Sequence, residues 1–219
     1  MDKESLNALE AVSDVADGAT VMVGGYGYCG VPESLLRALC EHHSRNLTII
    51  ISNAMAGNTG IGRLLENRQV RKVISTYVEE EQRFEELMLN GDLVIELVPQ
   101  GTFAERIRSA GAGIGAFYTP TGFGTIIAEG KAMRAWDGRH YVLEFPLRAD
   151  FAFVKAWKGD RRGNLVYRGV ARNFNPVMAT AAAITIAEVE ELVPPGELDP
   201  DSIHTPEIFV QRIVQEARD

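Results

Sequence analysis

The stretch that decides the fold is Val-Met-Val-Gly-Gly-Tyr-Gly-Tyr-Cys-Gly-Val-Pro, residues 21–32. An apolar run of three residues is followed by four glycines, Gly24, Gly25, Gly27 and Gly30. Glycine is favoured where the backbone takes positive φ or lies against a ligand without a Cβ, and Pro32 suits the first position of a helix. We therefore predict a strand, a glycine turn and a helix N-terminus whose free N–H groups face an anionic or polarised oxygen.

A dinucleotide site is the first interpretation to test. The glycines from Gly25 onward fit the spacing G-x-G-x-x-G in the correct strand-to-helix context. Such a site also needs an acidic residue about 20 residues later, at the end of the next strand. The predicted next strand, Leu47–Ile51, ends in Ser52 and Asn53 with no Asp or Glu. A nicotinamide or flavin site is therefore disfavoured.

Composition indicates one globular domain spanning residues 1–219, with 46% hydrophobic and 24% charged residues. A net charge of −8 argues against nucleic acid as the main partner, because phosphate binding needs a basic surface. The sequence contains neither an apolar signal segment at its start nor an apolar run long enough to span a membrane. The two cysteines, Cys29 and Cys40, form no disulfide framework, and we expect a cytoplasmic location.

The first half of the chain alternates between strands and helices. The predicted strands are Thr20–Val23, Leu47–Ile51, Val70–Thr76 and Val94–Val98. The predicted helices are Ser5–Val15, Pro32–Glu41, Ile61–Glu66, Glu80–Leu89 and Thr102–Ala110. Because the strands are nearly continuous apolar runs, both faces of the sheet should be covered. This pattern predicts an α/β fold with a mostly parallel sheet and helices on both faces.

The second half adds a β-hairpin region. Asp137-Gly138 lies between the predicted strand segments Lys131–Ala135 and His140–Glu144, which is typical of a two-residue hairpin turn. Further strands are predicted over Phe151–Trp157, Leu165–Tyr167 and Ile184–Val189, with helices over Pro176–Ala183 and Gln211–Arg218. No interdomain linker is evident in the sequence.

The candidate binding surface lies beyond the carboxyl ends of the strands, where ligands bind in open parallel sheets. Three loops leave such ends: Gly24–Val31, Ser52–Asn58 and Pro99–Gly101. They offer amides and backbone donors but no carboxylate, lysine or histidine. These groups can hold an oxyanion or a carboxylate, but they supply neither a nucleophile nor a proton shuttle. We predict half of a site, in which another chain supplies the attacking group.

Motifs in the same order along nearly the whole chain resemble the alpha subunits of family I CoA-transferases of the 3-oxoacid type (succinyl-CoA:acetoacetate or 3-oxoadipate). The resemblance begins with Asp17-Gly18 and the glycine turn. It continues through Pro99–Thr102, Ala104–Arg108, Gly111–Gly113, Ala116–Thr119, Phe151–Trp157, Gly163-Asn164 and Ala171–Asn175.

The resemblance implies transfer of CoA from an acyl-CoA, often succinyl-CoA, to a 3-oxo acid. A glutamate attacks the thioester and carries the CoA as a glutamyl thioester. In two-chain members this glutamate lies on the beta subunit, so no catalytic residue is expected here, and that partner would complete a heterodimer or heterotetramer. CoA is a substrate, and no cofactor or metal is expected. The substrate-binding residues implied for this chain are Gly24, Gly25, Tyr26, Gly27, Gly30, Asn53, Gln100 and Gly101.

The chain departs from the family pattern at two places. Tyr26 stands where the family usually has Phe, and Ser52-Asn53 stands where it often has a pair of asparagines. Which of the family's two asparagines Asn53 replaces is left open by the sequence.

Other polar residues have structural explanations that we favour. We expect Cys29 to pack against its neighbours and His42-His43 to interact with the helix dipole. We expect the acidic run Glu79–Glu81 and Glu85-Glu86 to form a solvated helix face. A structural or interface role is expected for Arg172, Asn173 and Asn175. Metal-ligand spacings such as C-x-x-C or H-E-x-x-H are absent from the sequence.

Three alternatives stay open at this point. An acyl-CoA hydrolase on the same scaffold would release free CoA to water. A phosphosugar-binding or regulatory domain would place phosphate at the glycine turn, although that turn lacks basic residues. A single chain could also be catalytically complete, in which case it would turn over without a partner.

Overall fold

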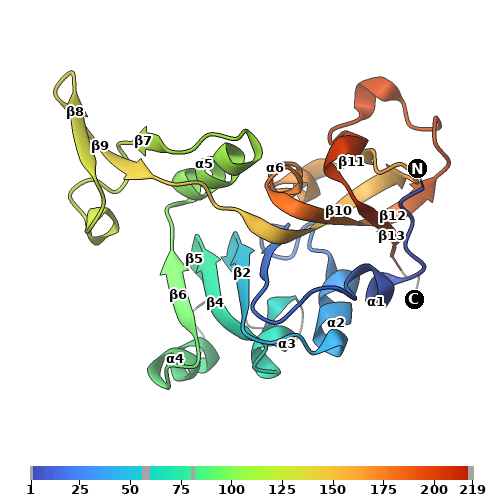
Figure 1. Ribbon diagram of the computed structural model, residues 1–219, viewed down its shortest axis with the longest axis horizontal. Coiled ribbons are helices and arrows are strands. Elements are labelled where there is room, and N and C mark those ends of the chain that lie inside the picture. The colour runs from blue at the N-terminus through green and yellow to red at the C-terminus, as the bar shows by residue number, and fades with distance from the viewer. Residues whose placement is uncertain (1, 56–59, 80–81, 217–219) are drawn as a thin grey trace.

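A parallel sheet forms the centre of the computed structural model, which describes residues 2–55, 60–79 and 82–216 (Figure 1). Its strands are β1 (Thr20–Val23), β2 (Leu47–Ile51), β4 (Val70–Ser75), β6 (Val94–Leu97), β10 (Ala149–Asp160), β11 (Leu165–Val166), β12 (Ala182–Val193) and β13 (Arg212–Gln215). The order is β13-β12-β10-β1-β2-β4-β6, and each neighbouring pair in it is parallel. Strand β11 pairs antiparallel with β10. The α/β prediction is confirmed.

Helices cover both faces of this sheet. They are α1 (Ala8–Ala11), α2 (Glu33–His42), α3 (Ile61–Glu66), α4 (Gln82–Leu89), α5 (Gln100–Gly111) and α6 (Asn175–Ala179). Residues of α1 to α4 pack into one buried cluster, and residues of α5 and α6 pack into another. Side chains alternate along each strand, so Val21 and Val23 enter the first cluster while Met22 enters the second. This arrangement explains the continuous apolar runs of the central strands.

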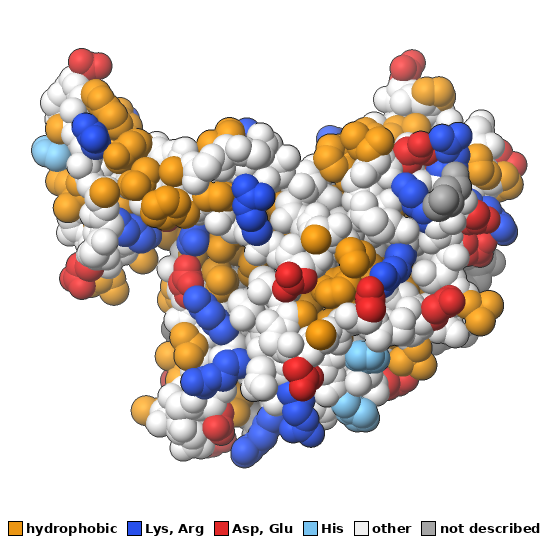
Figure 2. Space-filling view, in the orientation of Figure 1, with side chains coloured by type: hydrophobic (Ala, Val, Ile, Leu, Met, Phe, Trp, Pro, Cys, Tyr) orange, Lys and Arg blue, Asp and Glu red, His pale blue; other side chains and the backbone are white. Residues whose placement is uncertain are grey.

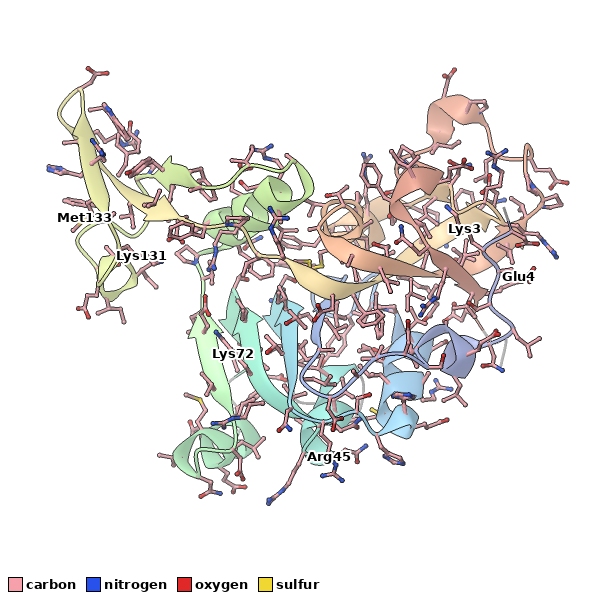
Figure 3. The ribbon with its side chains drawn as sticks, viewed as in Figure 1. Lys3, Glu4, Arg45, Lys72, Lys131 and Met133 are labelled. Carbon is pink, nitrogen blue, oxygen red and sulfur yellow. The ribbon has the colours of Figure 1, made fainter. Side chains whose placement is uncertain are left out.

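A three-stranded antiparallel sheet projects from the body as an arm (Figure 1). It consists of β7 (Phe117–Thr119), β8 (Met133–Trp136) and β9 (Arg139–Glu144), in the order β7-β9-β8. Asp137 and Gly138 join β8 to β9 with φ of 50° and 74°, as a type I′ turn requires. The predicted hairpin is confirmed. Figure 2 shows hydrophobic side chains along this arm, and Figure 3 places Lys131 and Met133 on it.

Short elements complete the fold. Two two-residue strands that the sequence did not predict, β3 (Asn53–Ala54) and β5 (Tyr77–Val78), pair in parallel beside the main sheet. Four 3₁₀ helices are η1 (Ile126–Ala128), η2 (Gly169–Arg172), η3 (Pro200–Ser202) and η4 (Glu207–Phe209). Within the described ranges, no helix combines the length and the apolar character that crossing a membrane would require.

The two ends of the chain differ from the prediction for one shared reason. The prediction of a helix over Ser5–Val15 was wrong in extent, because α1 comprises only Ala8–Ala11, and Leu6 before it is 88% exposed. The residues before it are extended beside β13: Ser5 N donates to Ile213 O (2.8 Å) and Ile213 N donates to Lys3 O (2.9 Å). Lys3 and Glu4 therefore lie beside the C-terminal strands (Figure 3).

The prediction of a helix over Gln211–Arg218 was wrong for its described residues. This segment forms strand β13, which pairs in parallel with β12, and residues 217–218 lie outside the described part. Ile213 and Val214 are buried and β-branched, which suits a strand enclosed between β12 and the N-terminal residues.

Strands β10 and β12 are longer than predicted. Helix α6 ends at Ala179, so Ala182 and Ala183 belong to β12 rather than to a helix over Pro176–Ala183. The pairing of β10 with β12 runs from Ala149 opposite Ala182 to Asp160 opposite Val193, so both strands extend beyond their apolar centres.

Candidate functional site

The glycine turn between β1 and α2 is tightly folded on itself. Tyr26 N donates to Cys29 O (3.0 Å), and Cys29 N donates to Tyr26 O (3.1 Å). Gly25 has φ of 122° and Gly30 has φ of 71°, values that residues with a Cβ rarely adopt. The ring of Tyr26 is thereby held at the tip of the turn, where it is half exposed.

Two of these glycines are required by packing against this chain's own residues. A Cβ on Gly24 would lie 1.8 Å from Asn175 Oδ1, and a Cβ on Gly30 would lie 2.4 Å from Ala171 O. A neighbouring segment of this chain therefore fills the space that a Cβ would need at these two positions.

That neighbouring segment, residues 171–175, holds the turn through two asparagines. The buried Asn175 donates from Nδ2 to Gly30 O (3.0 Å) and Ala171 O (2.9 Å) and accepts at Oδ1 from Lys155 N (2.8 Å). Asn173 donates to Cys29 O (3.0 Å) and accepts from Gly25 N (3.2 Å). The structural role favoured for these two residues is thus visible in the hydrogen bonds.

The N-terminus of α2 is also occupied from within the chain. Glu188 Oε2 accepts from Ser34 N (2.9 Å) and Leu35 N (3.1 Å), while its Oε1 accepts from Lys155 Nζ (2.8 Å). The expectation of free N–H groups facing a ligand is therefore wrong at these two residues. Pro32 precedes the helix as its N-cap rather than as its first residue.

This carboxylate and its partner are buried together. Burial raises the pKa of Glu188, against the opposing effect of Lys155. Burial acts to lower the pKa of Lys155, but Glu188 and the nearby Glu216 outweigh it and raise that pKa. Removing one member would leave an uncompensated buried charge, which is strongly destabilising. Glu188 is therefore part of the framework beneath the turn.

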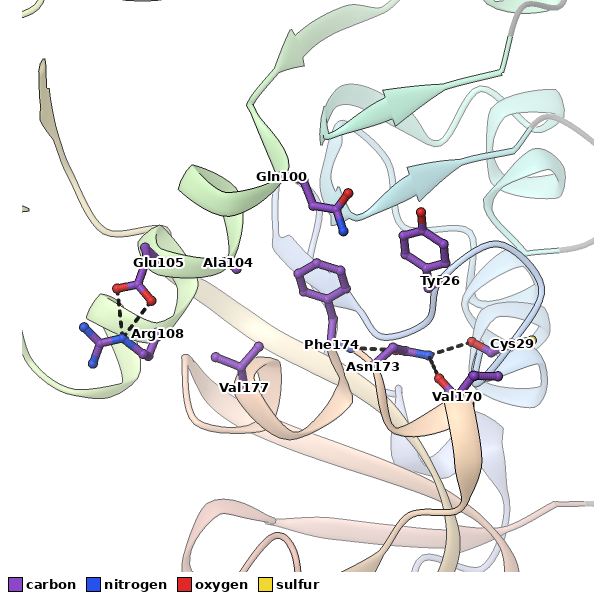
Figure 4. A pocket seen from close by; sticks show the side chains of 10 residues that line it. All are labelled: Tyr26, Cys29, Gln100, Ala104, Glu105, Arg108, Val170, Asn173, Phe174 and Val177. Carbon is purple, nitrogen blue, oxygen red and sulfur yellow. Dashed lines mark hydrogen bonds and ion pairs between the residues drawn. The ribbon is translucent and has the colours of Figure 1, made fainter. Parts of the chain in front are cut away.

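The largest hollow beside the turn is a mostly apolar cavity of about 720 Å³ (Figure 4). Its lining comes from the glycine turn, α5, η2 and α6: Tyr26, Cys29, Gln100, Ala104, Glu105, Arg108, Val170, Asn173, Phe174 and Val177. Figure 4 shows Gln100 and Tyr26 near one another, Phe174 between them and Val177, and the pair Glu105 and Arg108 at the other side. Helix α5 begins directly after β6, so this cavity lies where carboxyl-end loops of the sheet meet.

The structure separates the predicted site residues into three groups. Tyr26 and Gln100 line the large cavity. Gly27 and Asn53 line a separate, small hollow of about 20 Å³. The remaining ones are Gly24, Gly25 and Gly30 inside the turn and Gly101 on α5, none of which lines the large cavity.

Ser52 and Asn53 have different surroundings. The buried Ser52 hydroxyl lies 2.8 Å from Gly25 O and 3.0 Å from Asn53 Oδ1, so it ties the second strand to the turn. Asn53 is half-buried beside it.

Sequence reasoning missed most of the cavity wall. Asn173, Phe174 and Val177 follow the turn by nearly 150 residues, and although Asn173 belongs to a family motif, the sequence did not place these residues beside the turn. Helix α5 begins at Gln100, inside the predicted loop Pro99–Gly101 and before the predicted start at Thr102, so residues 100, 104 and 108 share one of its faces. Cys29 was expected to pack, but it is exposed and lines the cavity.

The chemistry available in the cavity is limited. Of the described residues, those that line it include no histidine or lysine, and Glu105, the carboxylate among them, accepts from Arg108 Nε at 2.9 and 3.1 Å. Elsewhere, His42 contacts Ser44 Oγ (2.7 Å) and Ser13 O (3.0 Å), a structural arrangement. In residues 2–55, 60–79 and 82–216, no group of three or more His, Cys, Asp or Glu could hold a metal ion.

The acidic run lies only partly within the structure. Glu80 and Glu81 are outside the described residues, while Glu79 and Glu86 both interact with other residues. Neither Glu85 nor Glu86 is among the residues lining the large cavity.

Among the described residues, the cavity at the carboxyl end of the parallel sheet presents the amide of Gln100, the phenol of Tyr26 and the guanidinium of Arg108, together with Glu105 paired to that arginine. A cavity at this position is typical of α/β proteins that bind a small ligand beyond the carboxyl ends of their strands. A family model described as coenzyme A transferase matches residues 6–216. The chain is 55% identical over 203 residues to one subunit of the succinyl-CoA:3-ketoacid coenzyme A transferase of Xanthomonas campestris, covering 93% of this chain and 84% of that one. It is 50% identical to one subunit of the 3-oxoadipate CoA-transferase of Acinetobacter baylyi, covering 98% and 95%. The chain belongs to the coenzyme A transferase family.

Solved structures share the fold. The crystal structure of an acyl-CoA transferase from Escherichia coli O157:H7 matches with a TM-score of 0.87 at 22% identity, over 98% of this chain. This chain spans only 47% of that one. The glutaconate coenzyme A-transferase of Acidaminococcus fermentans matches with a TM-score of 0.84 at 18% identity, over 97% of this chain and 75% of that one.

Proposed function

We propose that this chain is the alpha subunit of a two-subunit 3-oxoacid CoA-transferase, which moves CoA from an acyl-CoA such as succinyl-CoA to a 3-oxo acid. Relatives 50–55% identical carry the names of single subunits of such enzymes. The partner, the beta subunit, joins it in a heterodimer or heterotetramer and supplies the glutamate that forms the thioester. CoA acts as a substrate, and the reaction uses no other cofactor. Cytoplasmic action fits the two free cysteines.

The observation that carries this proposal is the content of the cavity. Gln100 and Tyr26 provide an amide and a phenol for the carbonyl oxygen of the acyl group, on which charge develops when the thioester is attacked. The carboxylate that lines the cavity is engaged with Arg108 and is not poised to attack. We therefore infer that the attacking carboxylate comes from the partner chain, which agrees with the relatives' names, since each denotes one subunit of a larger enzyme.

Reconstitution tests the proposal. The chain is purified alone, a candidate beta subunit is purified separately, and succinyl-CoA and acetoacetate are supplied to each and to the mixture. We expect acetoacetyl-CoA from the mixture only. Turnover by this chain alone would contradict the assignment of the nucleophile, and an inactive mixture across a panel of acyl-CoA donors and 3-oxo acids would contradict the proposed reaction.

A thiol assay separates transfer from hydrolysis. In the mixture, free CoA should not accumulate from succinyl-CoA when the acceptor acid is omitted, because the glutamyl thioester reacts with a carboxylate and not with water. Steady release of free thiol without acceptor would instead indicate an acyl-CoA hydrolase. The comparisons support the transferase and not this alternative or a phosphosugar-binding domain.

A further inference from the structure

The cavity has two chemically different ends joined by one helix. Gln100, Ala104 and Arg108 are spaced four residues apart on α5, so they form a stripe along one face that lines the cavity. The stripe spans about 12 Å at 1.5 Å per residue. An amide stands at its beginning, a small apolar residue at its middle and a cation at its end (Figure 4).

Arg108 is held in place with its donors available. Its Nε binds both carboxylate oxygens of Glu105, at 2.9 and 3.1 Å, which fixes the plane of the guanidinium. Its Nη1 and Nη2 groups make no hydrogen bond to any residue in the described ranges, and half of the side chain is exposed. A paired set of N–H donors in this geometry matches a carboxylate or a phosphate.

Arg106, two residues earlier, shows the contrast. Its Nε donates to Phe145 O (2.8 Å), its Nη1 donates to Glu96 Oε1 (3.0 Å), and only 14% of its side chain is exposed. It joins the body to the arm and does not line the cavity. Of the two arginines on this helix, one is committed to the fold and the other faces the cavity.

We propose that Arg108 is the receptor for an anionic group at the far end of the ligand whose reacting carbonyl lies at Gln100 and Tyr26. Two sources share this chemistry: the second carboxylate of a dicarboxylic acyl group or 3-oxo acid, and a phosphate of CoA. The apolar middle of the cavity, with Ala104, Phe174 and Val177, accommodates the carbon chain between the two ends. The inference rests on the proposed transferase function and makes Arg108 a determinant of which substrates it accepts.

The test compares Arg108→Gln with the wild type, each as the complete complex with its partner subunit. The control is Arg37→Gln, which removes the same charge from an exposed position on α2 outside this cavity. Two acceptors, 3-oxoadipate and acetoacetate, are compared with the same donor. Two donors, succinyl-CoA and acetyl-CoA, are compared with each other and each with its own 3′-dephospho form.

If Arg108 receives a carboxylate, kcat/KM should fall about 10- to 100-fold for the dicarboxylic substrates and change less than threefold for the monocarboxylic ones. If it receives a phosphate, kcat/KM should fall for every CoA donor, with a smaller loss for the 3′-dephospho forms when that phosphate is the one bound. Arg108→Lys should recover part of either loss. Either pattern supports the proposal.

Two results would overturn the proposal. One is an equal loss of kcat/KM with every substrate, 3′-dephospho donors included, that Arg108→Lys does not recover. The other is a kcat/KM within threefold of the wild type for all substrates. Failure of the proposed function is distinguishable, since the wild-type complex would then show no transfer with any pair.

Discussion

The two walls of the cavity are built in opposite ways. On the wall formed by the glycine turn and residues 171–175, the asparagine side chains direct their hydrogen bonds to the backbone of this chain. On the α5 wall, Gln100 makes no side-chain hydrogen bond to another described residue, and Arg108 keeps two donor groups available. From this contrast we expect the asparagines of the first wall to set the shape of the cavity, and Gln100 and Arg108, with the ring of Tyr26, to contact the ligand.

The strongest way to break this contrast is Gly24→Ala. The added Cβ would overlap Asn175 Oδ1, so we expect the free energy of unfolding to fall by more than about 3 kcal/mol, or the protein not to fold. Urea unfolding of the purified chain measures it. Gly101→Ala is the matched control: nothing lies within 4 Å of its Cβ position, and alanine favours the helix. Stability of Gly24→Ala within about 0.5 kcal/mol of wild type would show that the turn is not packed as described.

The α5 wall should give the reverse result. Gln100→Ala should lower kcat/KM of the complex about 100-fold, because a donor to the developing oxyanion is lost. Its free energy of unfolding should change by no more than about 0.5 kcal/mol, as expected for a residue outside the buried core. Steady-state kinetics and urea unfolding on the same preparation separate the two effects. Unchanged kinetics would remove Gln100 from the site.

Asn175→Ala sharpens the account of the first wall. It leaves the backbone groups of Gly30, Lys155 and Ala171 without their side-chain partner, and should lower the free energy of unfolding by about 2 kcal/mol. Asn173→Ala, at a half-buried position, should cost about half as much. Equal and negligible losses in both variants would mean that these asparagines do not hold the turn.

The smallest effect concerns pH and the junction of the arm. Burial acts to raise the pKa of Glu96, but Lys72 and Arg106 outweigh it and lower that pKa. A lowered pKa in the folded state gives stability that is present above the unfolded value and is lost as pH falls through the folded one. Below about pH 4, the free energy of unfolding should therefore decrease less in Glu96→Gln than in the wild type, by a difference of less than about 1 kcal/mol. Thermal unfolding between pH 3 and 7 measures it, and identical curves for both proteins would contradict it.

An element of this fold could be predicted from the sequence where the contacts that determine its conformation are local. Strands β1 and β2 and helix α3 match their predicted bounds, because each carries its own periodic pattern and end signals. The segments near Ser5 and Arg212 were predicted wrongly, since their extended conformation comes from pairing with each other across about 200 residues.

The site follows the same rule. Tyr26 and Gln100, which the family resemblance implies and which lie in predicted carboxyl-end loops, both line the large cavity. The place of Asn173, Phe174 and Val177 in the same wall was not predicted, because only the tertiary fold brings them against the glycine turn. Glu188 at the start of α2 was missed for the same reason, since a strand far along the chain supplies it.

The central claim is that this chain binds the acyl group while its partner attacks it. The most direct measurement mixes both chains with succinyl-CoA in the absence of acceptor, reduces the enzyme-bound thioester with borohydride, and maps the modified glutamate by peptide mass spectrometry. We predict a single reduced glutamate on the partner chain and an unmodified chain here. A reduced glutamate in this chain, at Glu105 or any other position, would contradict the account.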